Sequence, residues 1–316
     1  MSNLENRYRR LLRVLPRWYR AEREEEMVGL FLADRTDDLD LEHGWPGWGE
    51  TGATLALAAR ARLGVVGGPP RAAVVGEVVR LVALIGLLVQ VSYAFTWLGD
   101  SLTSTTLGAP GIAGVPLAVN LLLVGGAVAM ALGQRAPAKA LVCAVAVYGL
   151  VVVPLADDGP VAFLSVLWQL PLWMTAAALV LGFHRDAPAP NPWRWRWAML
   201  GVAVAAGAFG AASANWEFFT TLRVTAGELL PLVVLVAGVV HLVRRGPTAP
   251  GLAIAVWLLA LLPMELFSLR VTLAYPQAPG LAAYLLVRAT GLVVIAATLL
   301  VVGLRELRRP ARAVTP

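Results

Sequence analysis

Residues 74–97 read VVGEVVRLVALIGLLVQVSYAFTW, and the part from Leu81 to Gly99 contains no charged residue. A helix rises about 1.5 Å per residue, so roughly 20 apolar residues cross a hydrocarbon core about 30 Å thick. The stretch therefore predicts a membrane-spanning helix. No comparable run lies before Pro70.

Similar runs fill the rest of the chain. Hydrophobic residues make up 58% of the 316 residues and charged residues only 15%, with a mean hydropathy of +0.70, whereas soluble domains contain about 45–50% apolar and 25% charged residues. Reading the apolar runs against glycine, proline and charge breaks predicts eight transmembrane helices. Their ranges are 74–97, 112–132, 138–155, 161–183, 195–212, 224–243, 250–269 and 280–303. The predicted fold is an all-α integral membrane protein.

The charges of the intervening loops alternate along the chain. One set of loops and the C-terminal tail are basic, with Arg135, Lys139, Arg185, Arg194, Arg196, Arg244, Arg245, Arg305, Arg308, Arg309 and Arg312. The other loops contain Asp100, Asp157, Asp158, Glu217, Arg223 and Arg270. Because cytoplasmic loops are enriched in Lys and Arg, we expect a protein of the cell membrane with both termini in the cytoplasm. The basic residues behind the net charge of +6 are then explained by the orientation of the helices in the membrane. We therefore expect no nucleic-acid partner.

The first 70 residues predict a small cytoplasmic domain of three helices. The first 35 residues contain eight arginines and no apolar core of a signal peptide, so we expect the N-terminus to stay in the cytoplasm. The first helix places Leu4, Tyr8, Leu11, Leu12 and Leu15 on one face, opposite several arginines. We expect a second helix at 17–33, with Tyr19, Arg23, Met27, Leu30 and Phe31 on one stripe, and a third at 50–63. The predicted domains are thus 1–70, the membrane domain 71–304 and a basic tail 305–316.

This prefix resembles a known family in its motifs. They are LENRYRRLLR at 4–13, LPRWYR at 15–20, EEEM at 24–27 and GWP at 44–46. Over residues 1–65 they are similar to the helical HAAS-like, or permease-prefix, domain that begins many actinobacterial membrane proteins, often encoded beside PadR-like regulators. The resemblance implies a signalling role and a cytoplasmic or membrane-protein partner for residues 1–65, and it brings no catalytic residues.

Motifs for enzymatic chemistry are lacking in the sequence. H-E-x-x-H, G-x-S-x-G and a Walker loop do not occur, and the one G-x-G-x-x-G string, at 47–52, has no predicted strand before it as dinucleotide binding requires. The acidic segment with Asp37, Asp38, Asp40, Glu42 and His43 matches no calcium or zinc pattern. Cys143 is the only cysteine, which excludes an intramolecular disulfide. We therefore predict no catalytic residues, no metal and no cofactor.

Charged residues within the predicted spans are the best candidates for a site, because charge inside a bilayer is costly and is usually paired or functional. The candidates are Glu265, Arg288 and Glu228, together with Arg270 at the rim, just beyond the end of its span. We expect Glu265 and Arg288 to lie side by side, either as an ion pair joining two helices or as part of a ligand or ion site. The amides of Asn120 and Gln169 add polar groups at depth.

Three further signals concern packing. Pro171 inside a span predicts backbone that faces protein rather than lipid. Ala203, Gly207 and Ala211 recur every four residues and predict close helix approach. The tryptophans at 193, 195 and 197, which alternate with arginines, indicate an anchor at the membrane interface.

Two functions fit these observations. The first is a membrane-embedded sensor or regulatory protein whose cytoplasmic domain couples to a partner, and the alternative is a transporter or permease subunit. A transporter needs a polar pathway through both halves of its bundle, whereas a sensor needs a cavity on one side only. The predicted buried charges lie in the outer half, which favours the sensor.

Overall fold

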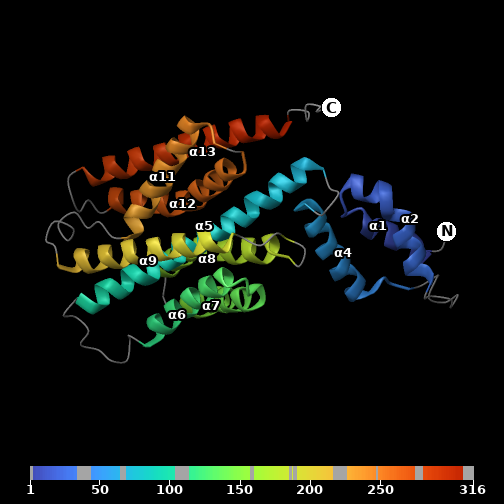
Figure 1. Ribbon diagram of the computed structural model, residues 1–316, viewed down its shortest axis with the longest axis horizontal. Coiled ribbons are helices and arrows are strands. Elements are labelled where there is room, and N and C mark those ends of the chain that lie inside the picture. Colours follow the sequence, from blue (N-terminus) through green and yellow to red (C-terminus); the bar gives the residue numbers. More distant parts are fainter. Residues whose placement is uncertain are drawn as a thin grey trace. The chain divides into compact units, whose positions relative to one another are not determined.

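In a computed structural model, most of the residues that the structure describes are helical, and none of them forms a strand. These residues are 3–33, 44–64, 69–103, 114–156, 160–184, 187, 191–215, 226–246, 248–274 and 280–308. The helices, labelled as in Figure 1, are α1 Asn3–Leu12, α2 Arg17–Ala33, α4 Gly47–Arg62, α5 Pro70–Thr103, α6 Gly114–Ala131, α7 Arg135–Ala156, α8 Pro160–Gly182, α9 Pro192–Asn215, α11 Ala226–Arg244, α12 Thr248–Ala274 and α13 Leu281–Arg308.

Five stretches in these helices are long and apolar enough to cross a membrane, judged by length and composition. They are Pro70–Gly99, Arg135–Val152, Trp193–Ala212, Thr248–Ala274 and Leu281–Arg308. Shorter apolar stretches lie in α6, α8 and α11, so every predicted span coincides with a helix. Several helices of this kind are typical of a multi-pass membrane protein.

The chain divides into two compact units. The first unit comprises Met1–Glu77 with His184–Ala187, and the second comprises Val78–Phe183 with Pro188–Pro316. In the first unit α1 contacts both α2 and α4. Its core contains Tyr8, Leu12, Leu15, Val28 and Ala58.

One detail of the predicted packing of α2 was wrong. Leu30 was expected on the buried stripe but is 67% exposed, whereas Val28 is buried. The reason is the position of Phe31, whose ring stacks on that of Tyr8 with the centroids 3.9 Å apart. This contact turns the face made by Met27, Val28 and Phe31 toward α1, and Leu30 lies about 110° from the middle of that face.

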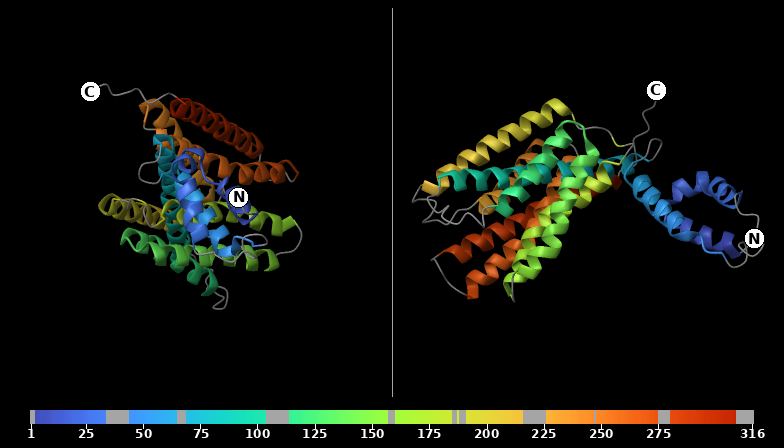
Figure 2. Two further views of the ribbon diagram at one scale, coloured as in Figure 1. Left: turned by 90° about the vertical axis from the view of Figure 1, so that its right-hand side faces the viewer. Right: turned by 90° about the horizontal axis from the view of Figure 1, so that it is seen from below.

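In the second unit α11, α12 and α13 contact one another, and α7 lies between α6 and α8. Figure 2 shows these neighbours from two further directions. Helix α12 contacts α8 and so joins the two groups. The indole of Trp257 on α12, fully buried, donates a hydrogen bond to the carbonyl of Val82 on α5 (3.1 Å).

Helices α5 and α9 cross with their backbones in close contact. A Cβ added to Gly99 would meet the carbonyl oxygen of Gly207, and one added to Gly210 would lie 2.9 Å from Cα of Thr96. Two of the three small residues predicted to allow close approach, Gly207 and Ala211, thus lie against Gly99 within one chain.

The three tryptophans in the first turns of α9 divide into two environments. Trp193 and Trp197 are exposed and in edge-to-face contact, with ring centroids 5.4 Å apart. Trp195 is buried in the core of the second unit, because residues two apart on a helix face opposite sides. The predicted interfacial anchor is thus limited to two of the three rings.

Candidate functional site

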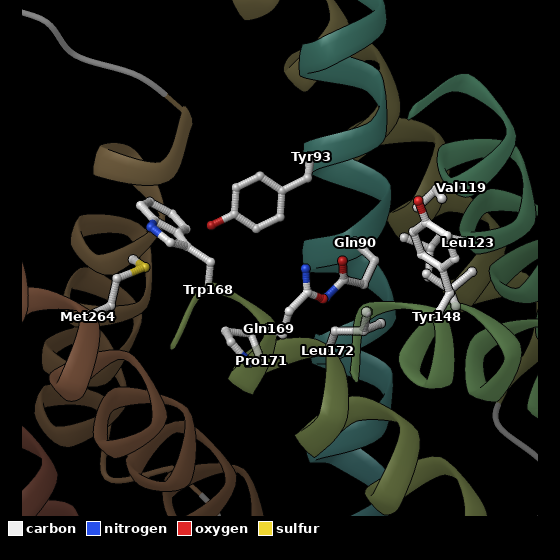
Figure 3. Close-up of a pocket in the computed structure, with 12 residues that line it drawn as sticks. Gln90, Tyr93, Val119, Leu123, Tyr148, Trp168, Gln169, Pro171, Leu172 and Met264 are labelled. Carbon is white, nitrogen blue, oxygen red and sulfur yellow. The ribbon is translucent and has the colours of Figure 1, made fainter. Parts of the chain in front are cut away.

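A cavity of about 250 Å³ lies inside the second unit, where side chains from five helices converge (Figure 3). Its lining consists of Gln90 and Tyr93 of α5, Val119 and Leu123 of α6, Val145, Tyr148 and Gly149 of α7, Trp168, Gln169, Pro171 and Leu172 of α8, and Met264 of α12. None of these residues is charged. The cavity therefore has an apolar and aromatic wall with a few neutral polar groups, which is typical of small-molecule sites.

The two glutamines supply most of the hydrogen-bonding capacity of this wall. Gln90 is buried, and Figure 3 shows its amide and that of Gln169 directed toward one another across the space between α5 and α8. Each amide offers one acceptor oxygen and two N–H donors. Gly149 makes room for Gln169, because a Cβ there would lie 2.7 Å from its Oε1.

Three aromatic side chains complete the polar and stacking surface. Tyr93, Tyr148 and Trp168 come from three different helices, and the hydroxyl of Tyr93 points toward the side on which Trp168 lies (Figure 3). A phenol hydroxyl both donates and accepts, and an indole N–H donates. A neutral molecule with an apolar body and one or two polar groups matches this lining.

Pro171 shapes the cavity through the backbone of α8. It is buried, as predicted for proline in a spanning helix, and it lacks the N–H that would bond to the carbonyl four residues earlier. The hydroxyl of Thr175 donates to the Pro171 carbonyl (2.6 Å). Gly86 of α5 gives Thr175 its space, because a Cβ at Gly86 would lie 2.7 Å from the Thr175 Cγ2.

The cavity lies near the middle of its helices and opens to the outside of the unit at Tyr148 and Trp168, which are 36% and 45% exposed. Gln169 is nine residues from the start of α8 and Tyr148 is eight from the end of α7, which corresponds to about 12–14 Å along each helix axis. In a hydrocarbon core about 30 Å thick, that depth is close to the middle.

The predicted Glu265–Arg288 pair is present and joins α12 to α13. Nη2 of Arg288 lies 2.5 Å from Oε2 of Glu265, and Nε donates to the same oxygen at 2.8 Å. Both side chains are buried, at 3% and 1% exposure. Arg288 also donates to the hydroxyl of Tyr284 (3.3 Å) and lies over its ring, with Cζ 5.1 Å from the centroid.

The two members of this pair lie at similar depths along their helices. Helix α12 continues to Ala274, five residues beyond the predicted end of its span. Counted from the helix ends, Glu265 lies about 13 Å deep and Arg288 about 10 Å, so the two groups are nearly level. The apolar pattern marked the hydrocarbon core, while the helix extends past Arg270, which is exposed.

Of the other candidates, Arg270 is the one whose side chain the structure describes, and it is exposed. Glu228 belongs to α11, but its side chain lies outside the described residues, as do Glu217, Arg223 and the acidic segment 37–43. Asn120 lines a separate cavity of about 80 Å³ beside Phe95 and Trp97. Among the residues that the structure covers, no three His, Cys, Asp or Glu side chains gather where they could hold a metal ion.

Gln169 and Pro171 were singled out from the sequence, but the other residues of the cavity were not. Gln90 could also have been singled out from the sequence, because it is the only amide side chain in the uncharged run 81–99. Tyr93, Tyr148 and Trp168 carry no pattern that separates them from ordinary packing residues, and only the meeting of five helices brings them together.

A second surface of interest is the basic first helix. Arg9 forms two hydrogen bonds with Glu25 of α2, at 2.7 and 2.8 Å, and one with Glu5 at 3.0 Å. The hydrogen bond from Arg9 lowers the pKa of the Glu25 carboxyl below its usual value. Burial, with a smaller contribution from Glu50, raises the pKa of Tyr8. The arginine-rich and glutamate-rich segments of the prefix thus pair with each other in part.

Comparison of the chain with known protein families, with curated proteins and with solved structures gave no match.

Proposed function

We propose that this chain is a membrane-embedded sensor that binds a small uncharged molecule in the cavity between α5, α7 and α8. The observation that carries the proposal is the lining itself, which has two amides, two phenols and an indole but no charged group. Burying an ion there would require an opposite charge, whereas a neutral polar group needs only a hydrogen-bonding partner. The proposed ligand therefore has an apolar body and one or two neutral polar groups.

The proposal includes a topology of eight spans with both termini in the cytoplasm. It is supported by the eight helices that coincide with the predicted ranges and by the basic loops. The HAAS-like prefix would then couple the sensor to a cytoplasmic or membrane-protein partner. Reporter fusions at Pro316 and near Asp157 test this topology, and a periplasmic signal from Pro316 would contradict it.

The ligand site can be tested with an uncharged alcohol that carries a photoreactive diazirine. We expect irradiation of the reconstituted protein to label the peptides that contain Tyr93 and Trp168. Gly149→Leu should abolish this labelling, because its side chain would occupy the space of Gln169. Asn120→Leu, which changes the separate small cavity, is the matched control. Trp168 and Trp197 are both exposed, at 45% and 55%, so equal labelling of the two would count against a specific site.

A transporter is the second candidate, and one observation favours it. Proline lies inside two helices at the cavity: Pro171 lines it directly, and Pro263 of α12 precedes the lining residue Met264. Each proline leaves one backbone carbonyl of its helix without its usual N–H partner, and free backbone carbonyls near the middle of a bundle are typical of transporter binding sites.

The two candidates differ in which side of the membrane reaches the cavity. Cysteine placed at Gln169 in a Cys143→Ser background can be probed with a charged, membrane-impermeant thiol reagent applied to either side. A sensor predicts modification from one side only, because the other half of the bundle stays closed. Modification from both sides would establish alternating access and favour the transporter.

A further inference from the structure

A second cavity of about 300 Å³ lies where the C-terminal ends of α11 and α13 meet the N-terminal end of α12. Its polar lining consists of His241, Arg245, Thr248 and Glu306, and its apolar lining includes Leu242, Leu299 and Val302. All of these residues belong to the second unit. This cavity is separate from the one proposed above and shares none of its lining residues.

The imidazole of His241 is held in a space that only glycine leaves open. A Cβ at Gly246 would lie 2.6 Å from its Nδ1, and one at Gly251 would lie 2.8 Å from its Nε2. These two glycines flank the turn between α11 and α12. The ring is therefore fixed at the wall of the cavity by the backbone on two sides.

Arg245 occupies a backbone position where glycine is the usual residue. Its φ is +48°, and the chain reverses through hydrogen bonds from Gly246 N to His241 O and from Arg245 N to Leu242 O, both 3.2 Å. This pattern is the Schellman helix end, whose left-handed residue is normally glycine because a Cβ is strained there. An arginine at this place lines the cavity with a cation at the expense of backbone strain.

The polarity of the cavity changes along α13. Glu306, which accepts a hydrogen bond from the Thr248 hydroxyl, lies near the end of the helix, and Leu299 lies two turns deeper. Seven residues of helix span about 10 Å. The cavity thus has a cation, an imidazole and a carboxylate at its mouth and an apolar wall below them.

We infer that this cavity binds the headgroup of a phospholipid that carries both a phosphate and a primary amine, as phosphatidylethanolamine does. The phosphate would lie against Arg245 and His241, the ammonium against Glu306, and the start of the acyl chains against Leu299 and Val302. Basic pockets between helix ends are a known means of lipid recognition. Here the carboxylate adds a preference for a headgroup that also bears a positive charge.

The test uses the full chain in nanodiscs of phosphatidylcholine that contain equal parts of dioleoyl phosphatidylethanolamine and dioleoyl phosphatidylglycerol. Native mass spectrometry measures which lipid stays bound after release. We expect the wild type to retain the ethanolamine lipid preferentially. Arg245→Gly should reduce this retention about tenfold, as the loss of one charge-assisted hydrogen bond does. The same substitution should keep or raise the melting temperature, because glycine relieves the left-handed backbone.

Two further variants sharpen the result. Glu306→Gln should shift retention from the ethanolamine lipid toward the glycerol lipid, because the ammonium loses its carboxylate. Arg270→Gln, at the opposite end of α12, is the matched control and should leave retention unchanged. Equal retention by the wild type and Arg245→Gly would overturn the proposal. So would a wild-type preference for phosphatidylglycerol, or release of the bound lipid by soluble glycerophosphoethanolamine.

Discussion

The two units each contain an arginine–glutamate contact, and the two contacts lie in opposite environments. Glu25 in the first unit leaves 81% of its side chain exposed beside Arg9, whereas Glu265 and Arg288 in the second unit are 1% and 3% exposed. Water screens the first pair and solvates either partner alone. The second pair has replaced all of its water with protein contacts, so removing one partner strands the other.

The largest expected effect is therefore the loss of one member of the buried pair. We expect Glu265→Gln or Arg288→Gln alone to lower the free energy of unfolding by about 3–5 kcal/mol, and the double variant to lower it by less than the sum. Equilibrium unfolding in lipid bicelles, arranged as a double-mutant cycle, measures the coupling. Coupling near zero would mean that the charges are not each other's main partner.

The same cycle separates the two roles considered for these charges. If the single variants keep their stability but lose photolabelling of the central cavity, the pair belongs to the ligand site. If they lose stability and the double variant recovers labelling, the pair acts as a joint between α12 and α13.

A smaller loss of stability is expected from replacing a glycine by alanine. The surroundings of the glycines also differ between the two units. Gly210→Ala should destabilise the protein by about 1–3 kcal/mol, because its Cβ would lie 2.9 Å from the Thr96 backbone on α5. Gly201→Ala in the same helix and Gly29→Ala in α2 have no neighbour within 4 Å. These two controls should be neutral or stabilising by up to about 1 kcal/mol, as thermal denaturation would show. A loss of stability in all three would argue against the close crossing of α5 and α9.

The exposed pair should show a weak effect that salt removes. We expect Arg9→Gln and Glu25→Gln to be nearly additive in the stability of the first unit, because exposed ion pairs contribute little and are screened. Hydrogen exchange of the α1 and α2 amides at low and at high salt measures this. Coupling that persists at high salt would show that the pair is more protected than its exposure indicates.

The smallest expected effect is on acid stability. The Arg9 hydrogen bond lowers the pKa of Glu25 in the folded state from its usual value of 4.5. A lowered carboxyl pKa stabilises the fold above the unfolded-state value, and this contribution is lost as the pH falls through the folded-state value. Carbon-13 NMR of labelled glutamate should therefore show Glu25 titrating below 4.5, and Arg9→Gln should return it toward that value. An unchanged titration would show that Arg9 is not the cause.

The positions of the helices could be predicted from the sequence because a run of apolar residues has few other stable environments than the bilayer. The ends of the helices were predicted less accurately. Helices α5 and α12 continue six and five residues past the predicted spans, since backbone hydrogen bonds extend into polar interface residues that break the apolar pattern.

The candidate site was only partly predictable. Glu265 and Arg288 stood out because ionised groups are rare at depth. The cavity did not stand out, because its polar groups are neutral. Its residues also come from five helices, so whether they meet depends on which helices are neighbours. The contact of α12 with α8 brings Met264 to Trp168 and Gln169, and no local pattern in 248–274 specifies that contact.

Met264 and Glu265 are consecutive residues of α12, directly after Pro263, yet one lines the central cavity and the other holds Arg288. Proline removes one backbone hydrogen bond just before them, which leaves this part of the helix easier to bend. A molecule that presses on Met264 therefore acts on the same backbone that positions Glu265. Coupling between two sites is reciprocal. If a ligand in the cavity strengthens or weakens the ion pair, formation of the ion pair must therefore change the affinity of the cavity for that ligand by the same factor.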